Sequence, residues 1–362
     1  MIFNCSNSWT AKNIFSAEKQ VWKVFETSRK LKTKRKAKKN INMLWYFAYG
    51  MVAVVFGFAL YQIRQYYEIK KKVEEYNKFQ EQFQNMNYRK VLKKAGPQSL
   101  PEAELIKTLR YNPTQTEAIE RFASVIQGTQ CAFAKKSLIW STDTWDQNKS
   151  IDENVARDID VLKVFLKEGA RLGLDGFLIE IRGEKLVNSV EAWGESVRLA
   201  LSAISSRNED KYDCMTKSYI DKPGWAFEFC KEPVFVTTFA PFYPSDNARY
   251  QFDAPKDSAY ILLQPEFSFM LHNIGMDTAQ TNWENPQTIR DRIRIDYKKA
   301  GRPYEIPDTI HYSSAIGVVP PINLGEPQPQ WWKRPVANVS HVSTEDAAKK
   351  TSQKNEHQKK KD

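Results

Sequence analysis

Cysteine and histidine are scarce in this chain of 362 residues, which contains four of each. No two cysteines form a CxxC pair, and their scatter argues against a disulfide framework and a zinc site. The histidines show neither HExxH nor HxH spacing, so a multi-histidine metal centre has no local support. The motifs GxGxxG, GxxxxGK and GxSxG are also absent, which removes the usual signatures of dinucleotide binding, P-loops and serine hydrolases.

The sequence also lacks a basic globular part, although its formal net charge is +11. Positive charge is concentrated in residues 1–43, 64–94 and 333–362, which carry +9, +5 and +4, so the segment between 95 and 332 is acidic. Flanking charge of this kind is poor support for nucleic-acid binding. We therefore expect no nucleic-acid partner.

Charged residues are absent from residues 44–63, "LWYFAYGMVAVVFGFALYQI". At about 1.5 Å per residue, a helix of this length spans roughly the 30 Å hydrocarbon core of a bilayer. Tyrosine and tryptophan gather at its two ends, where aromatic rings favour the membrane interface, and basic segments bracket it. These features predict one transmembrane helix at 44–63, preceded by a basic leader at 1–43, in a single-pass membrane protein.

The orientation of this span depends on where translation begins. The basic residues at 29–39 outnumber those that follow the span, which favours an N-terminus on the positive side of the membrane. A start at Met43 would remove the leader and reverse that preference. The leader has few acids, as mitochondrial transit peptides do, which makes the mitochondrial inner membrane one candidate location.

The remainder of the chain divides into three parts. Apolar residues at intervals of three or four predict a helical stalk at 64–94, and Ala95-Gly96-Pro97 ends it. Residues 98–328 alternate helical and strand patterns and form the expected globular domain. Residues 329–362 are polar and aperiodic, so we expect a disordered tail.

The globular part is predicted to combine helices and strands around one mixed sheet. Strands separated by helices at irregular spacing, with adjacent strands near the centre, indicate a single α+β domain. The expected helices cover residues 99–109, 114–128, 151–173, 189–206, 265–274 and 285–301, and the expected strands lie within 131–140, 176–182, 225–239 and 259–264.

A long loop interrupts the most strand-like region. About nineteen residues separate "PVFVTTF" (233–239) from "AYILLQ" (259–264), and they include "PFYPSDNARYQF" (241–252). Ordered loops of this length in compact domains are usually functional. The sequence therefore places a candidate functional loop here.

Four stretches of the globular part occur together in a recognisable order: "QCAFAKKS" (130–137), "WAFEFCKEPVFVTTFAPFYPSDNARYQF" (225–252), "LLQPEFSF" (262–269) and "IRDRIRIDY" (289–297). In these stretches the chain resembles a family known as YqcI/YcgG, and the resemblance covers about 110–325. Some members of that family look like haem-dependent oxygenases that hydroxylate a guanidine nitrogen of arginine or an arginine-derived substrate, and most members have no established activity.

The resemblance implies a haem cofactor, for which three residues are candidate ligands. Cys131 matches the family's Pro-Cys-x-Phe-Ala stretch, with Gln130 in place of the proline. It either ligates iron as a thiolate or is a small buried apolar residue. His272 is either an axial metal ligand or a helix cap, and His311 is a weaker candidate for the same role.

The resemblance also implies candidate catalytic residues in and after the long loop. Arg249 either clamps a propionate or substrate carboxylate, or pairs with Asp246 or Glu266, while Tyr250 packs or hydrogen-bonds beside it. Glu266 either receives a guanidinium substrate or caps the following helix. The family's loop often carries a histidine shortly before its arginine, and here Asn247 or a neighbour stands there, which puts catalysis in doubt.

Two functions follow from these features. The first is a membrane-anchored, haem-dependent monooxygenase that N-hydroxylates a guanidine or amino substrate, with electrons from a partner protein. The second is a non-catalytic accessory or scaffold subunit, tethered to the membrane within a larger assembly. The missing loop histidine favours the second function, and the resemblance favours the first.

Overall fold

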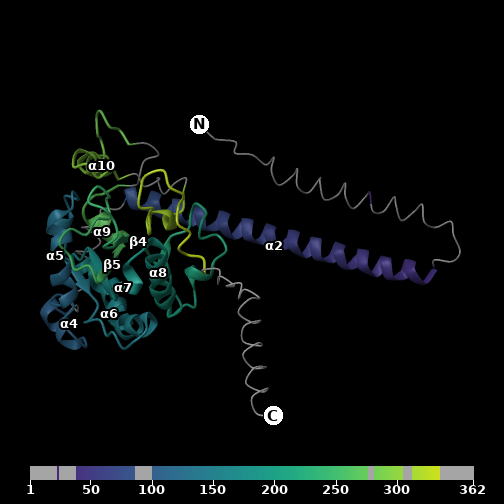
Figure 1. Ribbon diagram of the computed structural model, residues 1–362, viewed down its shortest axis with the longest axis horizontal. Coiled ribbons are helices and arrows are strands. Elements are labelled where there is room, and N and C mark those ends of the chain that lie inside the picture. The colour runs from purple at the N-terminus through teal and green to yellow at the C-terminus, as the bar shows by residue number, and fades with distance from the viewer. Residues whose placement is uncertain (1–22, 24–37, 86–99, 276–280, 305–311, 335–362) are drawn as a thin grey trace, which may run out of the picture. The chain divides into compact units, whose positions relative to one another are not determined.

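The computed structural model describes residues 23, 38–85, 100–275, 281–304 and 312–334 (Figure 1). The chain divides into two compact units, Met1–Glu68 and Ile69–Asp362.

The predicted transmembrane segment lies in helix α2, Lys38–Asn85. Within the part of the chain that the structure describes, no helix is long and apolar enough to cross a membrane. The uncharged run 44–63 lies within this helix, and charged residues follow it directly. Arg64 and Glu68 follow it as an ion pair of 3.2 Å. The predictions of a transmembrane helix and of a single-pass location, the mitochondrial inner membrane included, are therefore wrong.

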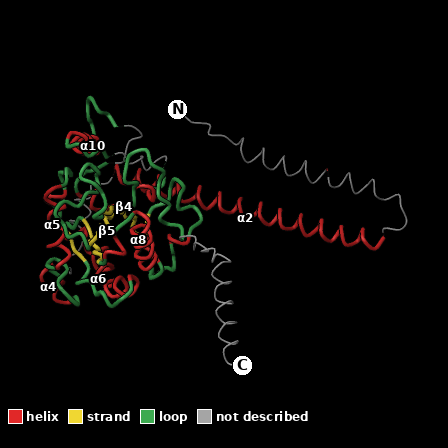
Figure 2. The backbone as a smooth tube through the Cα atoms, in the orientation of Figure 1, coloured by secondary structure: helices red, strands yellow, loops and turns green. Residues whose placement is uncertain are grey.

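The centre of the second unit is a mixed sheet of five strands, which agrees with the α+β part of the fold prediction. The strand order is β1-β2-β5-β4-β3, with β1 parallel to β2 and the other pairs antiparallel. Figure 2 shows strands in yellow, with β4 and β5 next to each other. The strands are β1 (Ile139–Ser141), β2 (Gly176–Arg182), β3 (Phe227–Phe229), β4 (Glu232–Phe239) and β5 (Ser258–Pro265).

Helices connect and cover these strands. Helix α6 makes the crossover between the parallel strands β1 and β2, as such a pair requires. The helices are α4 (Glu102–Thr108), α5 (Glu117–Gly128), α6 (Ile151–Leu172), α7 (Glu184–Val187), α8 (Val190–Ser205), α9 (Glu266–Leu271) and α10 (Ile289–Lys299). Short 3-10 helices lie at η2 (Ala134–Lys136), η3 (Cys214–Thr216) and η4 (Ser314–Gly317).

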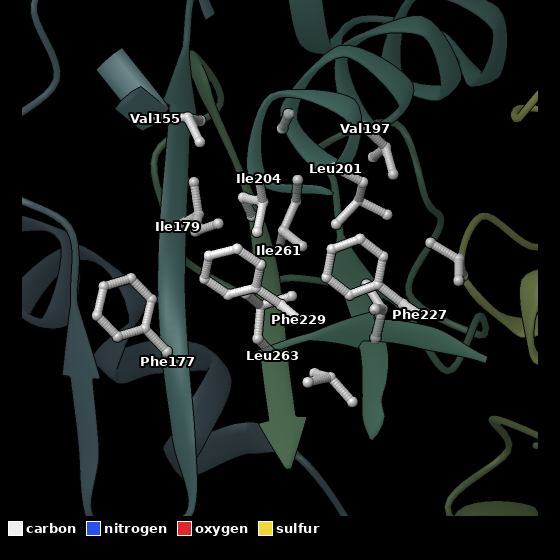
Figure 3. Packing of buried hydrophobic residues seen from close by; sticks show 14 of the residues in the cluster. Val155, Phe177, Ile179, Val197, Leu201, Ile204, Phe227, Phe229, Ile261 and Leu263 are labelled. Atoms are coloured by element: carbon white, nitrogen blue, oxygen red, sulfur yellow. The ribbon is translucent and has the colours of Figure 1, made fainter. Parts of the chain in front are cut away.

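One face of the sheet packs against α6 and α8 to form the main core (Figure 3). Alternate residues of β2 and β5 point to this face, among them Ile179 and Ile261, which Figure 3 shows beside Ile204 of α8. A capping box at Ser150 begins α6. Packing on this face holds the strands in place, and the same strands form the opposite face of the sheet.

The opposite face of the sheet packs against α5, so the central strands are buried on both sides (Figure 1). The intervening residues of the strands, Leu178, Tyr260 and Phe239, join Phe122 and Val125 of α5 in a second, smaller apolar cluster. Because α5 has only 12 residues, it covers only part of this face. The candidate site lies on the same face, beyond α5.

Two local predictions needed correction. Of the strand expected at 131–140, only the last part forms a strand, β1. The segment before β1 turns instead, because the backbone N–H of Ala134 donates a hydrogen bond to Cys131 O at 3.1 Å and the 3-10 helix η2 follows. Cys131 therefore lies in the connection after α5 and not on a strand. Trp331, inside the range assigned to a polar tail, is buried in the main core, and its Nε1 donates to Ala315 O at 2.8 Å.

Candidate functional site

A cavity of about 170 Å³ opens against the α5 face of the sheet. Its floor consists of alternate, same-face residues of two neighbouring strands, Phe235 and Thr237 of β4 and Leu262 and Gln264 of β5. Its walls come from α5, the connection between α5 and β1, α9, α10 and the long loop before β5. Most of the lining is apolar, so the few polar groups that reach the cavity determine which ligands it can bind.

Arg249 reaches the cavity from the long loop between β4 and β5. The loop is held by the segment near η4, since Tyr243 Oη donates to Pro320 O (2.8 Å) and Asn247 Nδ2 donates to Ile322 O (2.8 Å). Asn247 Oδ1 also accepts the backbone N–H of Arg249 at 2.8 Å. These contacts turn the Arg249 side chain inward, where it is only 3% exposed.

The Arg249 guanidinium is buried without an ion-pair partner among the described residues. Its Nη2 donates to Gly317 O at 2.9 Å, and its centre lies 5.4 Å from the Tyr304 ring centroid. No described carboxylate oxygen lies within 4.0 Å of it. A buried cation that keeps N–H donors facing a cavity is costly unless an anion joins it.

Helix α10 adds two more guanidinium groups to the cavity. Arg290 and Arg294 line it together with Ile293 and Tyr297, at spacings of three and four residues that place all four on one helix face. Arg290 donates through Nε to Gly275 O at 2.9 Å and has no ion pair with a described residue. Arg294 is buried, and its Nη1 donates to Thr281 Oγ1 at 3.2 Å. The cavity therefore carries an excess of positive charge.

The single acidic residue among the described lining residues is Asp175, which holds His272. His272 Nε2 donates to Asp175 Oδ1 at 2.6 Å. The carboxylate is itself oriented by Ser268 Oγ, which donates to Oδ1 at 3.0 Å, and by Leu138 N, which donates to Oδ2 at 2.8 Å. Asp175 is thus fixed from two sides of the cavity and orients the imidazole ring.

Cys131 and Tyr297 lie where α10 approaches the end of α5. Tyr297 Oη and Thr129 Oγ1 form a hydrogen bond of 2.5 Å, and burial raises the pKa of Tyr297 to about 12. Burial also raises the pKa of the Cys131 thiol. Both side chains are therefore protonated and neutral near pH 7, so neither offsets the charge of the arginines.

The structure brings three of the sequence-predicted site residues to this one cavity: Arg249, Cys131 and His272. Glu266 does not line it and is the first residue of α9, the position expected of a capping carboxylate. Tyr250 does not line it either and stacks on Phe252 at 5.1 Å between ring centroids.

Two predictions remain, a ligand role for His311 and an ion pair for Arg249. His311 lies outside the described residues. The ion pairs considered for Arg249, with Asp246 or Glu266, are not present.

Sequence reasoning did not single out Asp175, Arg290, Arg294 or Gln264. The two arginines carried a usable signal, because their spacing of four residues on a helix places them on one face. Asp175 carried a weaker signal, an acid directly before a buried strand. Nothing local distinguishes Gln264 from other strand residues.

The cavity does not fit haem. The arginines and aromatic walls would suit propionates and a macrocycle, but burial favours the protonated Cys131 thiol over the thiolate that would ligate iron, and only Nδ1 of His272 is left as a ligand because Nε2 bonds Asp175. The described residues contain no group of three or more His, Cys, Asp or Glu side chains placed to hold a metal ion. The volume of 170 Å³ also lies below the roughly 300 Å³ at which pockets for drug-sized ligands begin.

Comparison of the chain with protein-family models, with curated proteins and with solved structures finds no match in any of the three. The resemblance to the YqcI/YcgG family and the haem cofactor that it implies therefore stay predictions.

Proposed function

We propose that the second unit binds a small organic anion, with its acid group on Arg249 and its apolar body in the cavity. The observation that carries this proposal is the buried guanidinium of Arg249, which lines an apolar cavity and has no ion pair with a described residue. A bound carboxylate would accept hydrogen bonds from the remaining N–H groups of Arg249 and neutralise the positive charge of its guanidinium.

The size of the cavity limits the apolar body to about one ring. An engineered cavity of about 150 Å³ in another protein holds benzene, and this one measures about 170 Å³. The ligand class is therefore a monocyclic or branched aliphatic acid. Phe235 and Phe269, which lie edge to face at 5.9 Å between centroids, offer aromatic surface for a ring.

The charge of the cavity argues against a guanidine or amine substrate. Arg249, Arg290 and Arg294 face the cavity, and the one described carboxylate, that of Asp175, already accepts three hydrogen bonds. A cationic substrate would meet like charges. Guanidine N-hydroxylation and the accessory-subunit alternative both stay predictions, and the geometry favours the binding of an anion.

The test is a comparison of matched ligands on the full-length chain. Calorimetry would measure the dissociation constants of 3-phenylpropionate and of its neutral amide for the unaltered protein, for Arg249→Met and for Arg207→Met. Arg207 is a control outside the cavity that pairs with Asp152 at 2.8 Å. Methionine keeps an unbranched apolar stem in place of the first part of the arginine side chain and removes a buried charge, so we expect Arg249→Met to fold.

We expect the protein to bind the carboxylate and to prefer it over the amide. Hydrogen bonds to charged groups contribute about 1.5–3 kcal/mol, so Arg249→Met should weaken binding about 10- to 150-fold while Arg207→Met leaves it unchanged. Equal binding of the acid and the amide, or equal loss in both variants, would refute the proposal.

A further inference from the structure

The geometry points to acid–base catalysis in this cavity, with His272 as the group that removes a proton from the bound organic anion and Asp175 as its positioning residue. This inference rests on the proposed function, because it concerns the same ligand. It adds a reaction: proton transfer at a carbon next to the carbonyl of a 2-oxo acid.

The imidazole of His272 is both fixed and accessible. Its Nε2 donates to Asp175 Oδ1 at 2.6 Å, while its side chain is 34% exposed and lines the cavity. The ring also packs on Phe133, with centroids 5.3 Å apart. A cavity that holds about one ring leaves a ligand anchored at Arg249 little room to avoid His272.

The hydrogen bond to Asp175 determines which ring nitrogen can act. An ionised carboxylate only accepts hydrogen bonds, so Nε2 must carry the proton and Nδ1 of the neutral ring has the free electron pair. No described residue donates to Nδ1. A carboxylate in this position also stabilises the imidazolium that forms when Nδ1 takes a proton, as in other His–Asp pairs.

The chemistry requires no cofactor. His272 Nδ1 takes a proton from the methylene carbon of the 2-oxo acid, and the electron pair of that C–H bond forms the C=C bond of an enolate with its charge on the former carbonyl oxygen. Arg249 holds the carboxylate, and the positive charge of Arg290 and Arg294 favours the anion that develops. Return of a proton from the imidazolium restores the substrate and the base.

If the His272–Asp175 pair only stabilised the fold, His272→Gln would be expected to have little effect. Asp175 and His272 join the start of β2 to the end of α9, and such a link needs only a donor at the position of Nε2. Glutamine places its amide N–H near that position and cannot act as a base. His272→Gln therefore preserves the link and removes the proposed chemistry.

The experiment follows hydrogen–deuterium exchange at the methylene group of phenylpyruvate by proton NMR. The full-length chain in D₂O would be compared with buffer alone and with His272→Gln, Asp175→Asn and Arg207→Met. Dissociation constants for phenylpyruvate and unfolding midpoints would be measured on the same samples. The NMR resonance of the His272 Nε2 proton would report the hydrogen bond to Asp175 independently of exchange.

We expect the protein to accelerate exchange over buffer, and His272→Gln to lower the rate at least about 100-fold, the usual contribution of a general base. The variant should keep its dissociation constant and its midpoint. Asp175→Asn should lose the Nε2 resonance and slow exchange at least tenfold, while Arg207→Met changes nothing.

The outcomes separate this inference from the proposed function. Binding of phenylpyruvate without accelerated exchange, or exchange that survives in His272→Gln, overturns the catalytic role and leaves anion binding intact. Failure of both phenylpyruvate and 3-phenylpropionate to bind overturns the proposed function itself.

Discussion

Replacement of Glu232 by glutamine should make the protein more stable above pH 7. Glu232 begins β4, and one of its carboxylate oxygens accepts the backbone N–H of Phe267 in the first turn of α9 at 3.3 Å. Burial is the main reason that the pKa of Glu232 rises from 4.5 to about 7, and the neighbouring charge of Glu266 adds to the rise. Glutamine keeps the hydrogen-bond acceptor and carries no charge.

The sign and size of the effect follow from proton binding. Between pH 4.5 and 7 the folded protein keeps the Glu232 proton that the unfolded chain releases, so the free energy of unfolding falls as pH rises through this range. The difference between the two pKa values corresponds to about 3 kcal/mol, lost in full above pH 7. Below pH 4.5 both states are protonated, and the variant should match the unaltered protein.

The assay is urea denaturation of the unaltered protein, Glu232→Gln and Glu184→Gln at pH 4 and pH 8. Glu184 is exposed at the start of α7 and serves as the control. Glu232→Gln should gain about 3 kcal/mol at pH 8 and little at pH 4, whereas Glu184→Gln should follow the unaltered protein. The same change at both pH values, or lower stability at pH 8, would refute the assignment of a partly buried Glu232 with a raised pKa.

Two further substitutions test the packing of the second unit away from the cavity. Asp158 is buried and pairs with Arg110 (2.5 Å) and Arg157 (3.0 Å), so Asp158→Ala should lower the free energy of unfolding by about 3 kcal/mol, measured by urea denaturation; a loss below 1 kcal/mol would contradict the ion pairs. Trp331→Ala should lower it by about 3–5 kcal/mol, because Trp331 is buried and donates to Ala315 O; an unchanged denaturation midpoint would show that residue 331 is not in the core.

The main elements of the sheet and its helices could be predicted because their signals are local. Strand β2 was predicted with its bounds, since a continuous apolar run starting at Gly176 is typical of a strand buried on both faces. Helix α6 begins at a capping box and ends at Gly173, whose φ of 74° favours glycine. The turn between β3 and β4 was less visible, because Cys230 and Lys231 adopt positive φ angles that usually select Asn or Gly.

The composition of the site could be predicted only in part, because its contacts join distant segments. His272 and Asp175 are 97 residues apart, and Arg249 and Gly317 are 68 apart. Loop length marked the segment that contains Arg249, and the family resemblance marked Arg249 itself, but no local pattern could pair an acid before β2 with a histidine after α9. The transmembrane prediction relied on local signals, an uncharged run with aromatic ends and basic flanks, whereas no helix among the described residues is long and apolar enough to cross a membrane.

The most direct measurement is a crystal structure of the full-length chain with 3-phenylpropionate. The account predicts the phenyl ring in the cavity against Phe235 and Phe269, with a carboxylate oxygen about 2.7–2.9 Å from a guanidinium nitrogen of Arg249. An empty cavity at saturating ligand, a carboxylate directed away from Arg249, or an ion pair between Arg249 and an acidic residue of the chain itself would contradict it.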